Sequence, residues 1–122
     1  MTHKTPLLFE RGTGSALRSG SYTKAARRAI EDALWHHSIN VAEVFGADKS
    51  DMMIDVEIAC QEPAQVEQVD LYSIFPYGQI NITTVAGGLD APHPKDVNQR
   101  RTIIAHAAIT VSLALSPKEG AV

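Results

Sequence analysis

The sequence predicts an α+β domain in which helices pack on one face of a mostly antiparallel sheet. Two patterns of apolar residues carry this prediction. From 23 to 38 the apolar residues recur at spacings of three and four, the pattern of an amphipathic helix. Over 52–60, 79–85 and 102–114 they alternate with polar residues, as in strands with one buried side. A long helix over a sheet that contains these three strands is therefore expected.

The length and composition are those of one folded domain. At 122 residues the chain is long enough for one core, so we expect a single domain over 1–122 with a flexible tail at 116–122. Hydrophobic residues make up 44% and charged residues 20%, values typical of folded globular proteins. These values argue against a disordered chain.

Charge and cysteine content exclude several classes of function. The formal net charge of -3 offers no basic surface for nucleic acid. No apolar run approaches the roughly 20 residues of a membrane span, and the first residues lack the apolar stretch of a secretory signal, so we expect a cytoplasmic protein. The single cysteine, Cys60, rules out an intrachain disulfide and a cysteine-rich metal site. No metal and no cofactor are expected.

The first third of the chain has the pattern of a strand, a loop and a helix. The apolar run within 6–11 predicts the first strand, and the glycines at 12, 14 and 20 predict a glycine-rich loop after it. We expect Ser21 or Thr23 to cap the helix. Its apolar stripe consists of Ala26, Ala29, Ile30, Ala33, Leu34 and His37.

The remaining elements are separated by glycine and proline. We expect a short helix over 65–75, a loop from Gly87 to Asn98 and the last strand over 101–115. In that strand the odd-numbered residues from 103 to 113 form one apolar face, and His106 lies on the other face.

The start of the long helix is the first candidate site. Lys24, Arg27 and Arg28 lie in its first turns, where the helix dipole favours negative charge, so an anionic partner would stabilise them. Helix N-termini that follow glycine-rich loops bind anions. The predicted ligand-binding residues of this loop and helix are Gly12, Gly14, Arg18, Thr23, Lys24 and Arg28. The alternative is a tight strand-to-helix turn with solvated cations.

A second glycine pair is expected to face this site. Gly87 and Gly88 let a backbone approach a ligand closely, and the prolines beside His93 stiffen the segment that follows. Glu10 and His93 are the candidate catalytic residues, because either could transfer a proton. The alternative is a stiff connecting loop with an exposed histidine. His106 either lines a cleft or an oligomer interface or packs against its neighbours. A cluster of His106 with Asp55 and Glu57 is a further alternative, which the spacing of these residues does not require.

Four motifs span most of the chain. They are Glu10-x-Gly12-x-Gly14, the helical run from Thr23 to Ala33, Phe75-Pro76-Tyr77-Gly78 and Gly87-Gly88-Leu89. Together they resemble a small family of conserved hypothetical bacterial proteins of about this length. This resemblance implies no established activity.

A more distant likeness rests on the first loop, Tyr22-Thr23 and the Gly87-Gly88 pair followed by Pro92-His93. These features resemble one repeat of the cyanuric acid hydrolases and barbiturases, which are ring-opening amidohydrolases. That family has a serine before its paired glycines and a lysine in the first loop, whereas this chain has Ala86 and Glu10-Arg11. The architecture also resembles trimeric YjgF-like and bacillus-type chorismate mutase domains, which place ligand clefts between subunits.

We therefore expect binding of a small polar or anionic molecule near a subunit interface, by a ring-opening-amidohydrolase-like enzyme or its remnant. The alternatives are a non-catalytic ligand-binding or accessory subunit and a purely structural oligomer. A homo-oligomer is expected, with a trimer favoured, because the interior is rich in alanine and the last strand is apolar on both faces. No nucleic-acid or membrane partner is expected.

Overall fold

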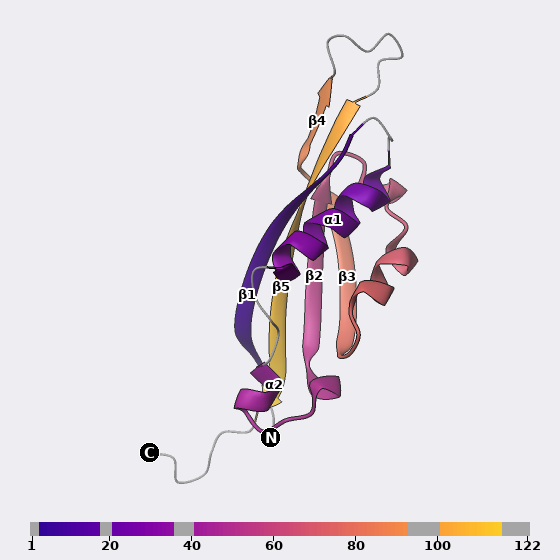
Figure 1. The fold of residues 1–122 in the computed structure, drawn as a ribbon. Helices are drawn as coiled ribbons and strands as arrows, with labels where there is room; N and C mark the ends of the chain where they lie inside the picture. Colours follow the sequence, from indigo (N-terminus) through magenta and orange to yellow (C-terminus); the bar gives the residue numbers. More distant parts are fainter. Residues whose placement is uncertain (1–2, 18–20, 36–40, 93–100, 116–122) are drawn as a thin grey trace.

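The computed structural model describes residues 3–17, 21–35, 41–92 and 101–115, and it confirms the predicted α+β fold. Two α-helices and several short 3-10 helices accompany a single sheet (Figure 1). The elements in chain order are β1 (His3–Ala16), α1 (Tyr22–Trp35), α2 (Val41–Val44), η1 (Lys49–Asp51), β2 (Met53–Cys60), η2 (Pro63–Gln65), η3 (Gln68–Ile74), β3 (Gln79–Ala86), β4 (Leu89–Pro92) and β5 (Arg101–Leu115).

The sheet is mostly antiparallel, and its strand order is β1-β5-β2-β3. The long strand β5 runs antiparallel to both β1 and β2, whereas β2 and β3 are parallel. The short strand β4 pairs with β5 beyond the end of β2. The expected strands at 52–60, 79–85 and 102–114 therefore all belong to one sheet, as predicted.

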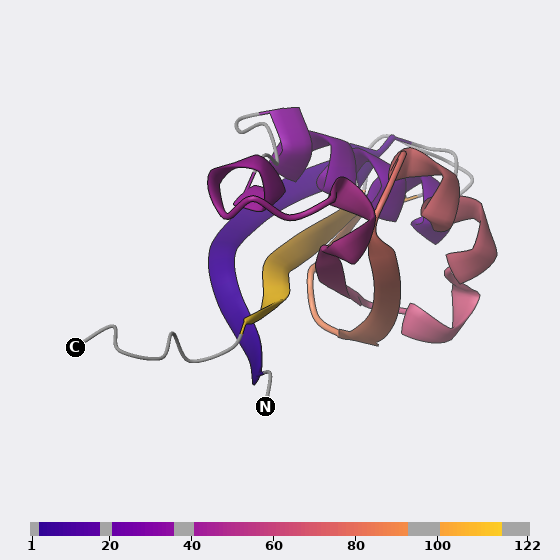
Figure 2. The same ribbon diagram turned by 90° about the horizontal axis from the view of Figure 1, so that it is seen from below.

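The core lies between this sheet and α1, which packs mainly on β1 and β5. Figure 2 shows α1 and α2 on the same side of the curved sheet. Ala26, Ala29, Ile30 and Ala33 of the predicted stripe are fully buried, and Leu34 packs against them, whereas His37 lies outside the described residues. The apolar faces expected for β2 and β5 are buried as well. The small alanines let the helix lie close to the sheet, so that a few large side chains fill the core.

The expected glycine-rich loop is absent over 12–16, because β1 continues as a strand to Ala16, and the predicted loop residues 18–20 lie outside the described residues. Gly12 and Gly14 have no positive φ and pair in register with β5. A Cβ atom on Gly12 would lie 2.2 Å from the carbonyl oxygen of Ala29, and one on Gly14 would lie 2.2 Å from the Ala29 nitrogen. The two glycines therefore serve close helix–strand packing, because any side chain there would collide with the backbone of α1.

The loop expected from Gly87 onward is also wrong in part, because 89–92 form β4. Gly88 has a φ of 64°, and it turns the chain from the end of β3 into line with β2, beside β5. The short helix expected over 65–75 is present as the two 3-10 helices η2 and η3. The expected tail at 116–122 lies outside the described residues.

Candidate functional site

The face of the sheet opposite α1, which we call the open face, carries side chains in rows that cross all four long strands. Strand pairing places one residue of each strand in a row, and alternate residues point to this face. Three rows carry its central side chains. They are Phe9–Thr110–Asp55–Asn81, Arg11–Ala108–Glu57–Thr83 and Thr13–His106–Ala59–Val85.

A cavity of about 590 Å³ lies on the open face over the second and third rows. Its floor is made of small residues, among them Ala59 and Ala108, so the longer side chains around them leave a hollow. Its walls include Phe9, Arg11, Thr13, Glu57 and His106 of the sheet, and Asp32 of α1 borders it at the edge of β1, where it accepts the Thr13 N–H. The cavity thus joins an aromatic ring, a guanidinium, an imidazole and carboxylates, the mixture typical of small-molecule sites.

One cross-strand hydrogen bond orders the polar side chains of this cavity. The Thr13 hydroxyl lies 3.0 Å from Nδ1 of His106, which leaves Nε2 as the ring nitrogen that can contact a ligand. The backbone N–H of Thr13 donates to Oδ2 of Asp32 at 2.9 Å, which joins α1 to the edge of β1. Arg11 and Glu57 are exposed and form no ion pair with any residue that the structure describes.

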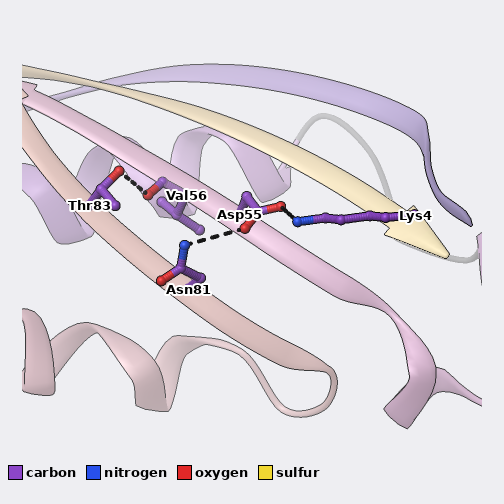
Figure 3. Close-up of polar contacts among 5 residues, drawn as sticks. All are labelled: Lys4, Asp55, Val56, Asn81 and Thr83. Atoms are coloured by element: carbon purple, nitrogen blue, oxygen red, sulfur yellow. Dashed lines mark hydrogen bonds and ion pairs between the residues drawn. The ribbon is translucent and has the colours of Figure 1, made fainter. Parts of the chain in front are cut away.

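In the neighbouring row of the open face, the carboxylate of Asp55 has a partner for each of its oxygens. In Figure 3, Nζ of Lys4 lies 2.7 Å from Oδ2 of Asp55, and the Asn81 amide donates to Oδ1 at 3.4 Å. The Thr83 hydroxyl turns to the carbonyl oxygen of Val56 at 3.5 Å. Asp55 therefore has partners on both oxygens, in contrast to Glu57.

The structure separates the residues predicted for the first loop. Gly12 borders the open-face cavity through its backbone, whereas Gly14 lies under α1. Glu10 shares the helix-facing side of β1 with both glycines, so its side chain points away from the open face. Arg18 and His93 lie outside the described residues.

Of the two caps predicted for α1, Ser21 or Thr23, the structure has Ser21. The Ser21 hydroxyl accepts a hydrogen bond from the Lys24 N–H at 3.0 Å. Thr23 instead accepts the N–H of Glu67 at 2.8 Å, which ties the helix start to the segment before η3. Thr23 and Lys24 line a separate, shallow hollow of about 610 Å³ against η3. The predicted helix-start residues thus do not share a cavity with those on the open face.

Two of the three cations near the helix start have intramolecular partners. Arg27 donates to the carbonyl oxygen of Asp70 at 2.5 Å, and Arg28 donates to that of Ser15 at 2.7 Å. The Ser15 carbonyl belongs to the outer edge of β1, which the sheet leaves without a strand partner among the described residues. The positive charge that suggested an anionic ligand therefore has a structural use at Arg27 and Arg28, because a guanidinium satisfies exposed carbonyl groups well.

Gly87 and Gly88 lie where β3 passes into β4. The side-chain amide of Gln61 donates to both of their carbonyl oxygens, at 2.9 and 3.1 Å. A Cβ atom on Gly88 would lie 2.3 Å from the carbonyl oxygen of Ile104. Neither glycine lines the open-face cavity or the hollow against η3.

A half-buried tyrosine–carboxylate contact lies at the same end of the sheet. The Tyr22 hydroxyl donates to Oδ2 of Asp90, while the buried Oδ1 of Asp90 has no hydrogen-bond partner among the described residues. Burial, followed by the hydrogen bond and charge of Asp90, raises the pKa of Tyr22 to about 12. Burial also raises the pKa of the nearby Cys60 thiol. The neutral phenol therefore holds the first residue of α1 against β4.

This contact predicts a stability difference that depends on pH. Tyr22→Phe should lower the free energy of unfolding by about 1–3 kcal/mol at pH 8, because it leaves a half-buried carboxylate without this donor. The pKa of Tyr22 rises on folding from about 10 to about 12. The advantage of the wild type over Tyr22→Phe is therefore complete below pH 10 and is lost as the pH rises towards 12.

Urea denaturation of both proteins between pH 8 and 12 measures this difference. The same comparison in an Asp90→Asn background should show a weaker dependence on pH. A constant difference across the alkaline range would contradict the assignment.

The sequence contains one indication of the open-face cavity, the alternation of residues in β1. Alternation in a strand places Arg11 and Thr13 on the face opposite Gly12 and Gly14. A strand over 12–14 therefore predicts that Arg11 and Thr13 lie together on the open face. Of the cluster of His106, Asp55 and Glu57 that the sequence suggests, His106 and Glu57 line the cavity, whereas Asp55 pairs with Lys4. The placement of His106 and Glu57 around one alanine floor depends on strand order, which the sequence alone does not reveal.

Comparison with known proteins places the chain among relatives of unknown activity. A family model described as conserved hypothetical protein (Lin0512_fam) matches residues 6–111. The crystal structure of an FtsZ-like protein of unknown function from Nostoc punctiforme PCC 73102 is similar, with a TM-score of 0.84 and 28% sequence identity over 93% of this chain and 99% of that chain. None of the curated proteins matches. The predicted resemblance to a conserved hypothetical family is confirmed, and neither match names a substrate or a reaction.

The helices in the described ranges are all too short or too polar to cross a membrane. Within the same ranges, no three His, Cys, Asp or Glu side chains are grouped so that they could hold a metal ion.

Proposed function

The chain belongs to the Lin0512 family of conserved hypothetical proteins, whose description names no activity. We propose that the open-face cavity binds a small polar molecule that carries a carboxylate or phosphate group. The observation that carries this proposal is the exposed guanidinium of Arg11, without an ion-pair partner among the described residues, in a cavity of about 590 Å³.

The polar groups around Arg11 support recognition of an oxyanion. A guanidinium binds a carboxylate or phosphate through two parallel hydrogen bonds, which fixes the orientation of the ligand. Thr13 and His106 lie in the next row and add hydroxyl and imidazole groups. The ring of Phe9 supplies an apolar wall for the rest of the molecule. This combination suits a small ligand that carries an oxyanion at one end.

The same proposal includes an enzyme and a non-catalytic binding protein as alternatives. Among the described residues that line the cavity, His106 is the side chain best suited to transfer a proton, because an imidazole both donates and accepts one. Conversion of a bound ligand that depends on His106 would support an enzyme, including the ring-opening activity suggested by the distant likeness. Binding without conversion would support an accessory or ligand-binding subunit.

Assembly and location also belong to this proposal. We propose a cytoplasmic homo-oligomer, with a trimer favoured, in which a second subunit covers the open face. Phe9 supports this arrangement because this large apolar residue, on the edge strand β1, is 62% exposed on that face. Light scattering at micromolar concentration measures the assembly. A monomer would contradict the oligomer, and a dimer would contradict only the trimer.

Titration with acetate and with inorganic phosphate tests the binding site. Arg11→Gln should weaken the binding of the better of these two anions at least tenfold, because a hydrogen bond to a charged group contributes about 1.5–3 kcal/mol. Lys24→Gln is the matched control, since it removes one exposed cation from the start of α1 instead. Equal binding by the wild type and Arg11→Gln would overturn the proposal. If only Lys24→Gln weakens anion binding, the anion binds at the start of α1 and not in the open-face cavity.

A further inference from the structure

A carboxylate lies opposite Arg11 in the same row of the open face. Arg11 on β1 and Glu57 on β2 both pair with Ala108 of β5. Neighbouring strands are about 4.8 Å apart, so the two backbone positions are separated by about 10 Å, with one methyl group between them. Both side chains line the cavity that the proposed function uses.

The two charges do not satisfy each other in the structure. Neither Arg11 nor Glu57 forms an ion pair with another described residue, whereas Lys4 of β1, which pairs with Ala114, reaches Asp55 of β2 at 2.7 Å. The open face therefore holds one closed pair of opposite charges and one open pair. The open pair flanks the alanine floor, where a ligand has room.

The charge around the cavity does not suit a simple anion. Its described walls include the carboxylates of Asp32 and Glu57 but only one guanidinium. Asp32 already accepts the Thr13 N–H. An anion bound to Arg11 would therefore also experience repulsion from Glu57 across Ala108, and a ligand that brings its own positive group would remove this repulsion.

We infer that the ligand is a small zwitterion of the amino-acid type, with its carboxylate on Arg11 and its ammonium group on Glu57. This inference rests on the proposed function and specifies the ligand class. The short distance across a single alanine favours compact molecules whose two charged groups are separated by one or two carbons. Thr13 and His106 then lie beside the ligand and can contact either of its charged groups.

Matched probes test the inference on the wild-type protein. Calorimetric titrations at pH 7 would compare β-alanine with propionate, which lacks the ammonium group, and with propylamine, which lacks the carboxylate; glycine and acetate form a shorter set. We expect each zwitterion to bind at least about tenfold more tightly than its carboxylate analogue, because it adds a charge-assisted hydrogen bond.

Substitutions then assign each end of the ligand. Glu57→Gln should abolish the preference for β-alanine over propionate while binding of propionate is kept or improved. Arg11→Gln should weaken both. Glu43→Gln, which removes an exposed carboxylate from α2 outside the cavity, is the control and should change neither.

The outcomes separate this inference from the proposed function. If propionate and β-alanine bind the wild type equally through Arg11, the zwitterion is wrong and the proposed function stands. If none of these probes binds, and acetate and phosphate also fail, both proposals are overturned. A preference for β-alanine that survives Glu57→Gln would overturn the role of Glu57, and with it the inference.

Discussion

Gly14→Ala is expected to lower the free energy of unfolding by about 3 kcal/mol, and Gly12→Ala by a similar amount. A Cβ atom at Gly14 would lie 2.2 Å from the nitrogen of Ala29 and 2.4 Å from the carbonyl oxygen of Ala25. At Gly12 it would lie 2.4 Å from the nitrogen of Ala33. These distances are far below van der Waals contact, and the atoms belong to the helix backbone, so α1 must move away from β1 and its buried stripe must repack.

Urea denaturation of each variant measures this loss. Thr13→Ala is the matched control, because Thr13 lies between the two glycines but faces the cavity. It should cost only about 0.2–1 kcal/mol through the lost contact with His106. Ala29→Gly should not rescue Gly14→Ala, since the collision involves backbone atoms. Stability near that of the wild type in Gly14→Ala would contradict the direct packing of α1 on β1.

Gly88→Ala is expected to cost about 3 kcal/mol for two reasons that add. An alanine at a φ of 64° is strained by about 1 kcal/mol. Its Cβ atom would also lie 2.3 Å from the carbonyl oxygen of Ile104 and 3.1 Å from that of Ala59, and relieving such an overlap costs about 2 kcal/mol. The strand β4 would separate from β5, and the contact between Tyr22 and Asp90 would weaken with it.

Gly46→Ala separates the two causes. Gly46 has nearly the same φ, 68°, but a Cβ atom there would meet no other atom within 4 Å. It should therefore lose only about 1 kcal/mol, the strain alone. Thermal or urea denaturation of the two variants gives the comparison. Equal losses would show that Gly88 is needed only for its backbone angle and that Ile104 can move aside.

The glycines show which part of the fold sequence reasoning could reach. A glycine in a sequence signals either freedom of φ or the absence of a side chain, and the two uses look alike. Gly88 has the positive φ expected of a turn, whereas Gly12 and Gly14 have ordinary strand geometry and serve packing. The predicted loop failed for this reason. The same misinterpretation hid the alternation that directs Arg11 to the open face.

The candidate site could not be predicted from any one segment, because its residues come from distant parts of the chain. His106 and Glu57 each carried a local signal, but only the order β1-β5-β2-β3 places them with Arg11 around Ala108. The cluster of cations at the helix start gave a stronger local signal. It suggested an anionic ligand, but Arg27 and Arg28 donate to backbone carbonyl groups instead.

The sequence by itself determined the fold class, the buried faces of α1, β2 and β5, a helix cap at Ser21 or Thr23 and the family resemblance. These features depend on the periodicity of apolar residues and on neighbours within a few positions, which any reader of the chain can follow. Only the tertiary structure decided that 12–14 is strand, that β4 continues the line of β2, and that Arg11 and Glu57 flank one cavity. Such contacts depend on strand order and register, which arise from packing across the whole domain and leave no pattern in any one segment.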